Sequence, residues 1–136
     1  VKEKGGKLTV TYNKNKERGE SLSKELDCEL AHARDAGMRA IDVLINCSPV
    51  GMSPNITESP FLARDFKEGM VVFDSVYNPL ETRLLREAKL AGCTVIPGYE
   101  LFINQAARQF ELWTGQSAPI NTLREVLLRK LATGGG

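Results

Sequence analysis

Three cationic side chains lie close together near the start of the chain, at Lys14, Lys16 and Arg18, directly after an extended-looking segment. Such a cluster suits a dianionic phosphate, because hydrogen bonds between charged partners are about twice as strong as those between neutral ones. In a dinucleotide-binding sheet, an acidic residue at the end of the second strand selects NAD, whereas a cation there accommodates the 2′-phosphate of NADP. A solvated, charged loop that leads into a helix explains the same residues, so both interpretations stay open at this point.

Two glutamines one helical turn apart form a second candidate group. Gln105 and Gln109 follow Leu101 at spacings of four, so the three side chains share one stripe of a helix. An adjacent apolar stripe, which we expect in the core, consists of Phe102, Ala106, Phe110 and Trp113. Because each amide both donates and accepts hydrogen bonds, the glutamine pair suits a neutral polyol. Ordinary glutamines on a solvent-facing helix are the alternative.

Two further segments carry residues that could contact a ligand. The loop at residues 47–52 holds a proline and a glycine on either side of Val50. Such a tight apolar turn could pack on a flat ring or simply connect two elements. Asp74 and Tyr77 could act as acid and base, although a tyrosine near the end of a buried strand is more often a core residue.

These residues lie between elements whose pattern predicts an α/β fold. Four strand-like runs are predicted, a β-branched and aromatic one at residues 7–12 and short apolar ones at 41–45, 70–73 and 93–96. The remaining periodic segments indicate helices at 17–30, 79–91, 99–113 and 120–131. Buried strands that alternate with helices are typical of a parallel sheet covered on both faces. Since ligands bind beyond the carboxyl ends of such strands, the polar segments that follow the four runs are expected to form one crevice.

The helix that follows Asn78 has the clearest predicted boundaries. Asn78 is a suitable N-cap, Pro79 fits the first turn, and Gly92 ends the helix. Its expected buried stripe consists of Leu84, Ala88 and Ala91.

Composition limits the possible classes of protein. The chain has 136 residues and a formal net charge of +1, which argues against a strongly cationic nucleic-acid binder and against a disordered acidic tail. No apolar run approaches the ~18 residues of a membrane span, and no signal peptide is visible. The three cysteines form no CxxC pair and His32 is the single histidine, so neither a disulfide framework nor a metal site is expected. The resulting expectation is a soluble domain in a reducing, cytoplasmic compartment.

Three blocks of this sequence resemble the shikimate dehydrogenases. Residues 46–55 look like the family segment Asn-x-Thr/Ser-x-x-Gly-Met-x-Pro. Residues 73–82 and 98–115 are similar to two further family segments, in the right order and spacing. The resemblance implies a Rossmann-like α/β fold, a parallel sheet with flanking helices. It also implies an NADP-dependent oxidoreductase that reduces 3-dehydroshikimate to shikimate in aromatic amino-acid biosynthesis.

The family's phosphate-selecting segment, Asn-Arg-Thr-x-x-Arg, is partly kept. Asn13 and Arg18 match this pattern, whereas Lys14 and Asn15 depart from it. A lysine keeps the positive charge but lacks the planar fork with which arginine stacks on adenine and binds a phosphate twice. The resemblance implies that Asn13, Lys14, Asn15 and Arg18 bind NADP and that the preference for NADP is retained.

The resemblance also assigns residues to the rest of the site. It implies a cofactor side formed by Ser48, Met52, Ser75, Gly98 and Leu101. Leu101 stands where the family usually has a methionine that packs on the nicotinamide ring. The implied substrate side is formed by Tyr77, Gln105 and Gln109. The two amides are expected to bind the hydroxyl groups or the carboxylate of the substrate.

Two parts of the family's architecture are expected to be missing from this chain. The catalytic lysine and aspartate belong to an amino-terminal substrate domain, and the first strand with its Gly-rich phosphate turn comes before Val1–Gly6, which resembles the end of the following helix. We therefore expect an incomplete NADP-binding domain at residues 1–119 and a carboxyl-terminal helix with a Gly tail at 120–136. Such a chain would be inactive without the amino-terminal domain as its partner.

Several alternatives stay open. A quinate/shikimate dehydrogenase paralogue and a non-catalytic dinucleotide-binding module both fit the same blocks. The parent could be a bifunctional enzyme with a dehydroquinate dehydratase domain, and a plant parent would imply a plastid location.

Overall fold

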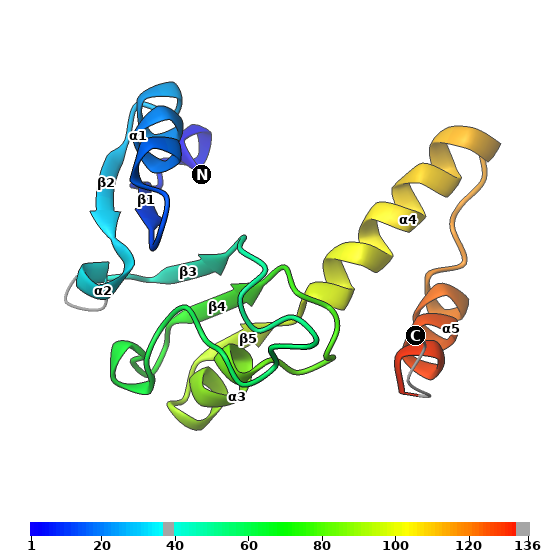
Figure 1. The fold of residues 1–136 in the computed structure, drawn as a ribbon. Coiled ribbons are helices and arrows are strands. Elements are labelled where there is room, and N and C mark those ends of the chain that lie inside the picture. The colour runs from blue at the N-terminus through cyan, green and yellow to red at the C-terminus, as the bar shows by residue number, and fades with distance from the viewer. Residues whose placement is uncertain (37–39, 133–136) are drawn as a thin grey trace.

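Short parallel strands form the centre of the fold. The computed structural model describes residues 1–36 and 40–132 (Figure 1). Its strands are β1 (Thr9–Tyr12), β2 (Glu29–His32), β3 (Val43–Asn46), β4 (Val71–Asp74) and β5 (Thr94–Ile96). β1 pairs with β2 in one sheet, and β3, β4 and β5 pair in that order in a second sheet, every pairing being parallel.

Helices connect the strands and continue beyond the last one. The described helical segments are η1 (Lys2–Lys4), α1 (Lys16–Glu25), α2 (Ala33–Ala36), η2 (Ala63–Asp65), α3 (Arg83–Leu90), α4 (Gly98–Thr114) and α5 (Ile120–Ala132). The predicted α/β fold with a parallel sheet is therefore confirmed. The helices expected at residues 99–113 and 120–131 correspond to α4 and α5, and the Gly tail lies outside the described residues.

The predicted helix at residues 17–30 is wrong in its last part. α1 ends at Glu25, Asp27 adopts a left-handed conformation with φ of 47°, and the chain then enters β2. Leu30 pairs with Val10 of β1 instead of extending a helical stripe. The four-residue spacing of the leucines is typical of a helix, but the parallel pairing with β1 determines the conformation here.

The predicted start of the helix after Asn78 is also wrong. The Asn78 carbonyl oxygen accepts a hydrogen bond from the Ser53 N–H at 3.1 Å, so this residue belongs to a loop. Thr82 caps α3 instead, because its hydroxyl oxygen accepts a hydrogen bond from the Leu85 N–H at 3.3 Å. Leu84 and Ala88 are buried as expected.

Within the described residues, the two sheets are not paired with each other. A dinucleotide-binding fold has the strand order 3-2-1-4-5-6. The observed orders β1-β2 and β3-β4-β5 correspond to its strands 2-3 and 4-5-6, and no strand among the described residues takes the place of strand 1 (Figure 1). The described strands therefore match a Rossmann-like sheet on either side of the position of strand 1.

The core lies between α3 and one face of the three-stranded sheet. Its buried side chains are Leu44, Phe61, Phe66, Met70, Val72, Leu84, Leu85, Ala88 and Cys93. On the opposite face of this sheet, Val43, Ile45 and Ile96 are exposed. Parallel sheets are normally covered on both faces, so this second face lacks the cover that such sheets have.

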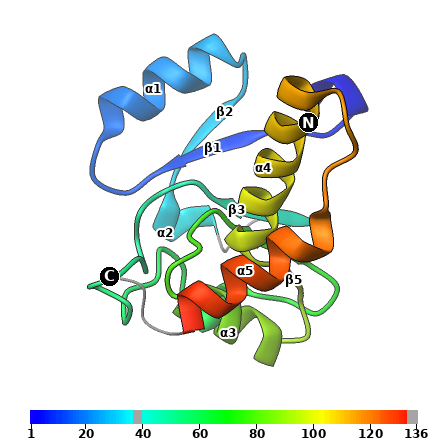
Figure 2. The ribbon, with the colours of Figure 1, turned by 90° about the vertical axis from the view of Figure 1, so that its right-hand side faces the viewer.

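α4 and α5 project from the sheet and pack against each other, as Figures 1 and 2 show from two directions. Ile103 and Ala107 of α4 are buried, and Arg124 of α5 pairs with Glu100 of α4. This hydrogen bond with Glu100 raises the pKa of Arg124.

The predicted core stripe on α4 is wrong, because Trp113 is 80% exposed and Phe102 is 43% exposed. The helix instead buries Ile103 and Ala107, and it packs on α5.

Candidate functional site

A pocket lies at the carboxyl ends of β3 and β4, where the sequence predicts a crevice. Its volume is about 730 Å³, and its lining residues are Cys47, Ser48, Pro49, Met52, Ser53, Ser75, Val76, Tyr77, Asn78 and Leu131. Most of these residues come from the two loops that follow β3 and β4, and Leu131 comes from α5. The pocket therefore brings together four predicted site residues, Ser48, Met52, Ser75 and Tyr77.

The loop after β3 is held in shape by its own hydrogen bonds. The Asn46 side-chain oxygen accepts hydrogen bonds from the Ser48 N–H at 3.0 Å and from the Ser48 hydroxyl at 2.7 Å. Gly51 is buried at φ of 90°, and a Cβ atom at this position would lie 3.1 Å from the Glu58 carbonyl oxygen. Only glycine fits such a turn without strain. As a result, Ser48 and Met52 face the pocket from one fixed turn.

Asp74 and Tyr77 have different surroundings. Asp74 is fully buried and is absent from the pocket lining, and its carboxylate accepts three hydrogen bonds. Tyr77 is 43% exposed and lines the pocket, with its ring 5.3 Å from the ring of Phe102. The structure therefore places the tyrosine, but not the aspartate, where it could contact a ligand.

α4 begins directly against the loop after β4. A Cβ atom at Gly98 would lie 2.6 Å from the Ser75 carbonyl oxygen, so only glycine allows this approach. The contact brings the first turn of α4, which carries the exposed Leu101, next to the pocket. Gln105 and Gln109 follow on the same helix and are exposed, but they do not line the pocket.

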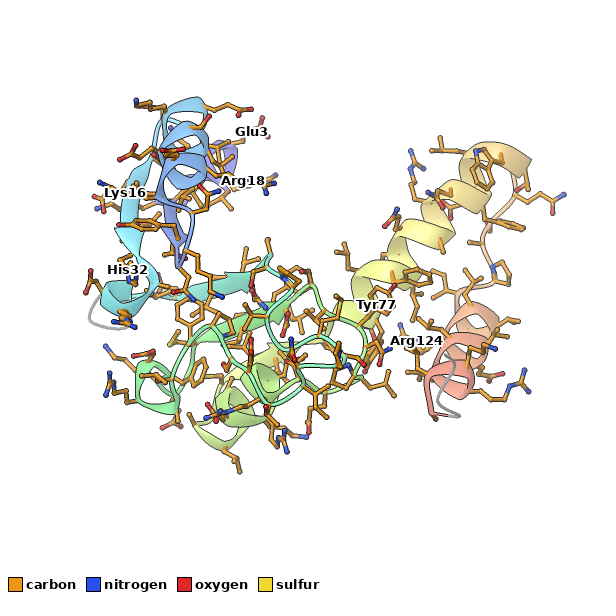
Figure 3. All side chains as sticks on the ribbon, viewed as in Figure 1. Glu3, Lys16, Arg18, His32, Tyr77 and Arg124 are labelled. Carbon is orange, nitrogen blue, oxygen red and sulfur yellow. The ribbon has the colours of Figure 1, made fainter. Side chains whose placement is uncertain are left out.

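The cation cluster, Lys14, Lys16 and Arg18, follows β1 of the other sheet and lies at the start of α1. Figure 3 shows Lys16 and Arg18 on α1 and Tyr77 in a separate part of the molecule. Lys16 pairs with Glu20 at 3.3 Å, whereas within the described residues Lys14 and Arg18 are exposed and form no ion pair. Their positive charges adjoin a helix N-terminus, a location that favours anions.

Asn13 and Asn15 lie in the same loop as these cations. Asn13 is exposed and directly follows β1. Asn15 is the N-cap of α1, and its side-chain oxygen accepts a hydrogen bond from the Arg18 N–H at 2.9 Å. This oxygen therefore fixes the start of the helix, and the amide nitrogen of Asn15 is the group left to face a ligand.

Sequence reasoning missed several residues that line the pocket. Cys47, Pro49, Ser53, Val76 and Asn78 flank the predicted site residues, so their positions beside the motifs could have indicated them. Leu131 is far away in the sequence, and only the packing of α5 brings it to the pocket.

In residues 1–36 and 40–132, no group of three or more metal-ligating side chains lies close enough to hold an ion. Within the same ranges, no helix has the length and apolar character needed to cross a membrane.

This chain is similar to known shikimate dehydrogenases. The family model of the shikimate 5′-dehydrogenase C-terminal domain matches residues 98–128. The NADP(+) shikimate dehydrogenase of Methanosarcina acetivorans is 37% identical over 93% of this chain and 48% of its own length. The corresponding enzyme of Methanopyrus kandleri is 39% identical, again over 93% of this chain and 48% of the relative. The chain thus spans about half the length of these curated relatives.

Solved structures agree with this result. The Thermus thermophilus shikimate 5-dehydrogenase, in complex with NADP(H) and shikimate, has a TM-score of 0.82 and 32% identity over 94% of this chain and 48% of its own. The quinate dehydrogenase of Corynebacterium glutamicum, in complex with NAD, has a TM-score of 0.78 and 29% identity over 90% of this chain and 46% of its own.

Proposed function

Because this chain belongs to the shikimate dehydrogenase family, we propose that it forms the carboxyl-terminal, NADP-binding side of an NADP-dependent shikimate dehydrogenase. The complete enzyme would interconvert 3-dehydroshikimate and shikimate. The observation that carries the proposal is the pocket at the carboxyl ends of β3 and β4, which unites Ser48, Met52, Ser75 and Tyr77 from two separate family segments.

The phosphate end of the cofactor would lie at the start of α1. Lys14 and Arg18 supply two exposed positive charges there, beside the positive end of the helix. Asn13 and the amide nitrogen of Asn15 are available as hydrogen-bond donors to the adenosine side of the ligand. The two positive charges fit the 2′-phosphate of NADP, whereas the neutral ribose hydroxyl of NAD would gain no charge-assisted contact from them.

The nicotinamide end would lie in the pocket. When bound there, NADPH supplies the hydride that reduces the substrate ketone. Ser75 offers a hydrogen-bonding hydroxyl in the pocket lining, and Met52 offers apolar surface there. The exposed Leu101, beside the lining on α4, offers further apolar surface against a flat ring. Gly98 allows α4 to approach the loop after β4 closely, because any side chain at this position would push that loop aside.

The substrate would bind between this pocket and a second domain. The Tyr77 hydroxyl and the amides of Gln105 and Gln109 face outward from the loop after β4 and from α4. They suit the hydroxyl groups or the carboxylate of shikimate. The carboxylate of Asp74 is fully buried and bonded to three donors, so it is not placed to exchange a proton with a substrate. The family's lysine and aspartate in the amino-terminal domain would handle the proton, and the described residues would contribute binding and orientation.

Reconstitution tests the proposal. The chain of residues 1–136 alone is expected to show no NADP-dependent oxidation of shikimate. Mixing it with the separately expressed amino-terminal portion, which would carry the substrate domain and the first strand with its Gly-rich turn, should restore that oxidation, followed through the absorbance of NADPH. Turnover by the chain alone would contradict the assignment of the catalytic residues to the other domain. Absence of activity in the complete enzyme would favour a non-catalytic dinucleotide-binding module.

A quinate dehydrogenase is the second candidate, because the Corynebacterium glutamicum quinate dehydrogenase shares the fold at a TM-score of 0.78. Quinate differs from shikimate at the ring, so the choice depends on the substrate side of the site. Parallel assays with quinate and shikimate, each with NADP and with NAD, distinguish the two. Faster oxidation of quinate than of shikimate would replace the first proposal with the second.

A further inference from the structure

We infer that Asp74 and Thr82 are a pair of positioning residues, an inference that rests on the proposed function. They would set the two walls of the pocket, the loop after β3 and the loop after β4, relative to each other. Neither residue lines the pocket, and both have an exposed fraction of 0%. Their role would be carried out through the loops that they hold and not through contact with substrate or cofactor.

Asp74 connects both loops through one carboxylate. One carboxylate oxygen, Oδ1, accepts a hydrogen bond from the Asn46 side chain at 2.9 Å and another from the Val76 N–H at 3.0 Å. The other oxygen, Oδ2, accepts a hydrogen bond from the Thr82 hydroxyl at 2.6 Å. The carboxylate thus binds one donor at the end of β3, one in the loop after β4, and one at the start of α3.

Asn46 connects Asp74 to the loop after β3, which is the first of the two walls. Its side-chain nitrogen donates to Asp74, and its side-chain oxygen holds the N–H and the hydroxyl of Ser48. The Asn46 carbonyl oxygen also accepts a hydrogen bond from the Ser75 N–H at 3.0 Å. Ser48 and Ser75, which both line the pocket, are therefore held by the same buried residue.

Thr82 fixes the same carboxylate to the core. Its hydroxyl donates to Asp74 and accepts from the Leu85 N–H, so both hydrogen-bonding functions of the hydroxyl are used. Leu84, Leu85 and Ala88 anchor α3 in the core. The Thr82 methyl group lies 3.9 Å from the position of a Cβ on Gly51, so Thr82 also borders the turn in the loop after β3. The two pocket walls are consequently tied to a rigid helix.

A buried charge of this kind is costly to desolvate and is not an efficient way to gain stability alone. An asparagine at position 74 would keep the shape, but the position of Oδ2 would then hold an N–H group facing the Thr82 hydroxyl. That hydroxyl would lose the acceptor of its proton and would have to reorient, so the loops would shift. Because catalysis depends on near-attack geometry, a displacement of about 1 Å can lower the rate about a hundredfold without removing a catalytic group.

The test uses the complete enzyme with four variants. Asp74→Asn removes the charge, Thr82→Val removes the hydroxyl, and Thr82→Ser keeps it. Asp65→Asn is the matched control, because Asp65 also accepts a backbone hydrogen bond, from the Leu62 N–H at 2.8 Å, but lies outside the pocket. For each variant we would measure the thermal midpoint, kcat, and KM for NADP and for shikimate.

Asp74→Asn and Thr82→Val are each expected to lower kcat on the order of tenfold to a hundredfold per folded molecule. Thr82→Ser and Asp65→Asn should keep the wild-type kcat. The double variant Asp74→Asn/Thr82→Val should be no slower than the slower single variant, because both changes break the same connection. If Asp74→Asn does not fold, Thr82→Val and Thr82→Ser still decide between the outcomes.

Two results would overturn the inference. One is a lower thermal midpoint with wild-type kcat in the folded fraction, which would show a purely structural role. The other is a double variant whose loss equals the product of the two single losses, which would show independent effects.

A wild-type enzyme that oxidises no shikimate would instead reject the proposed function. In that case the alkylation rate of Cys47, which follows Asn46 and lines the pocket, replaces kcat as the readout. Positioning predicts that Asp74→Asn and Thr82→Val change this rate in the same direction, and an unchanged rate in both would overturn it.

Discussion

Individual side chains at the start of α1 determine how the chain would distinguish NADP from NAD. Lys16 is paired with Glu20, whereas Lys14 and Arg18 are exposed and, within the described residues, without an ion pair. Asn15 organises this loop by capping α1. The two unpaired cations therefore carry the proposed selectivity for the phosphate.

Replacing Lys14 and Arg18 together by alanine in the complete enzyme should raise the Kd for NADP and leave the Kd for NAD almost unchanged. Each hydrogen bond to a charged group contributes about 1.5–3 kcal/mol, so the expected increase is at least tenfold. Calorimetric titration with both cofactors measures the effect, and Lys16→Ala is the matched control because Lys16 is already paired with Glu20. An equal loss for NAD and NADP would rule out a phosphate role.

The described cysteines should differ strongly in reactivity. Cys47 is exposed in the pocket, whereas Cys93 is buried, donates to the Lys67 carbonyl oxygen at 3.2 Å, and has a pKa raised by burial. In the complete enzyme, iodoacetamide should modify Cys47 first, and NADP should slow that reaction. Peptide mass spectrometry at several reaction times measures both rates. Modification of Cys93 before Cys47, or no protection by NADP, would contradict the site.

The raised pKa of Cys93 also predicts a dependence of stability on pH. The folded protein holds this thiol proton more tightly than the unfolded chain does, so the contribution is complete below the ordinary thiol pKa and is lost as the pH rises through the folded value. The free energy of unfolding should therefore fall at alkaline pH, and Cys93→Ala should reduce this fall. Urea titrations across the alkaline range measure the difference, and identical pH profiles for both proteins would contradict the assignment.

At the scale of elements, the sequence predicts what depends on local pattern and fails where tertiary contacts decide. The sequence shows the strand-like runs of β1, β3, β4 and β5 and the periodicity of α4 and α5. It does not show β2, because the residues Glu-Leu-Ala-His have little strand preference and are extended by pairing with β1. Asn78 and Thr82 are both good caps, and burial of Thr82 against Asp74 makes the choice.

The same distinction applies to the site. Ser48, Met52, Ser75 and Tyr77 could be predicted together, because the carboxyl ends of parallel strands meet at one edge of a sheet. The exposure of Phe102 and Trp113 could not be predicted, because the helical pattern does not show whether α4 packs on the sheet or on α5.

The junction between β4 and α4 should be the element most sensitive to a single added methyl group. Gly98→Ala would place a Cβ 2.6 Å from the Ser75 carbonyl oxygen, so backbone must move. We expect a loss of about 1–3 kcal/mol in the free energy of unfolding, the usual cost of overpacking. Urea denaturation measures this loss. Arg108→Ala on the same helix is the control, because this exposed position should change stability by less than ~0.5 kcal/mol. Equal stability of the two variants would contradict the close approach.

On the scale of the whole molecule, the cation cluster belongs to the β1-β2 sheet and the pocket to the β3-β4-β5 sheet (Figures 1 and 3). An extended dinucleotide would have to cross the space between them, where a dinucleotide-binding fold has its first strand and Gly-rich turn. The inner edges of β1 and β3 are unpaired among the described residues, and Val43 and Ile45 are exposed beside them. Unpaired apolar strand edges favour association.

The isolated chain should therefore self-associate through this region. Replacing Val43 and Ile45 by lysine should shift the isolated chain toward the monomer, because charges on a strand edge oppose pairing. Light scattering coupled to size-exclusion chromatography measures the mass. Leu90→Lys is the control, since Leu90 is 84% exposed but lies on α3, away from the open edges. Association that is unchanged in the Val43/Ile45 variant would contradict a role for the open sheet.

The most direct test of the account is the steady-state oxidation of shikimate by the complete enzyme with NADP and with NAD. The account predicts turnover with a kcat/KM at least tenfold higher for NADP, since two charged contacts favour the phosphate. No turnover with either cofactor, or a higher kcat/KM with NAD, would contradict the claim that this chain forms the NADP-binding side of a shikimate dehydrogenase.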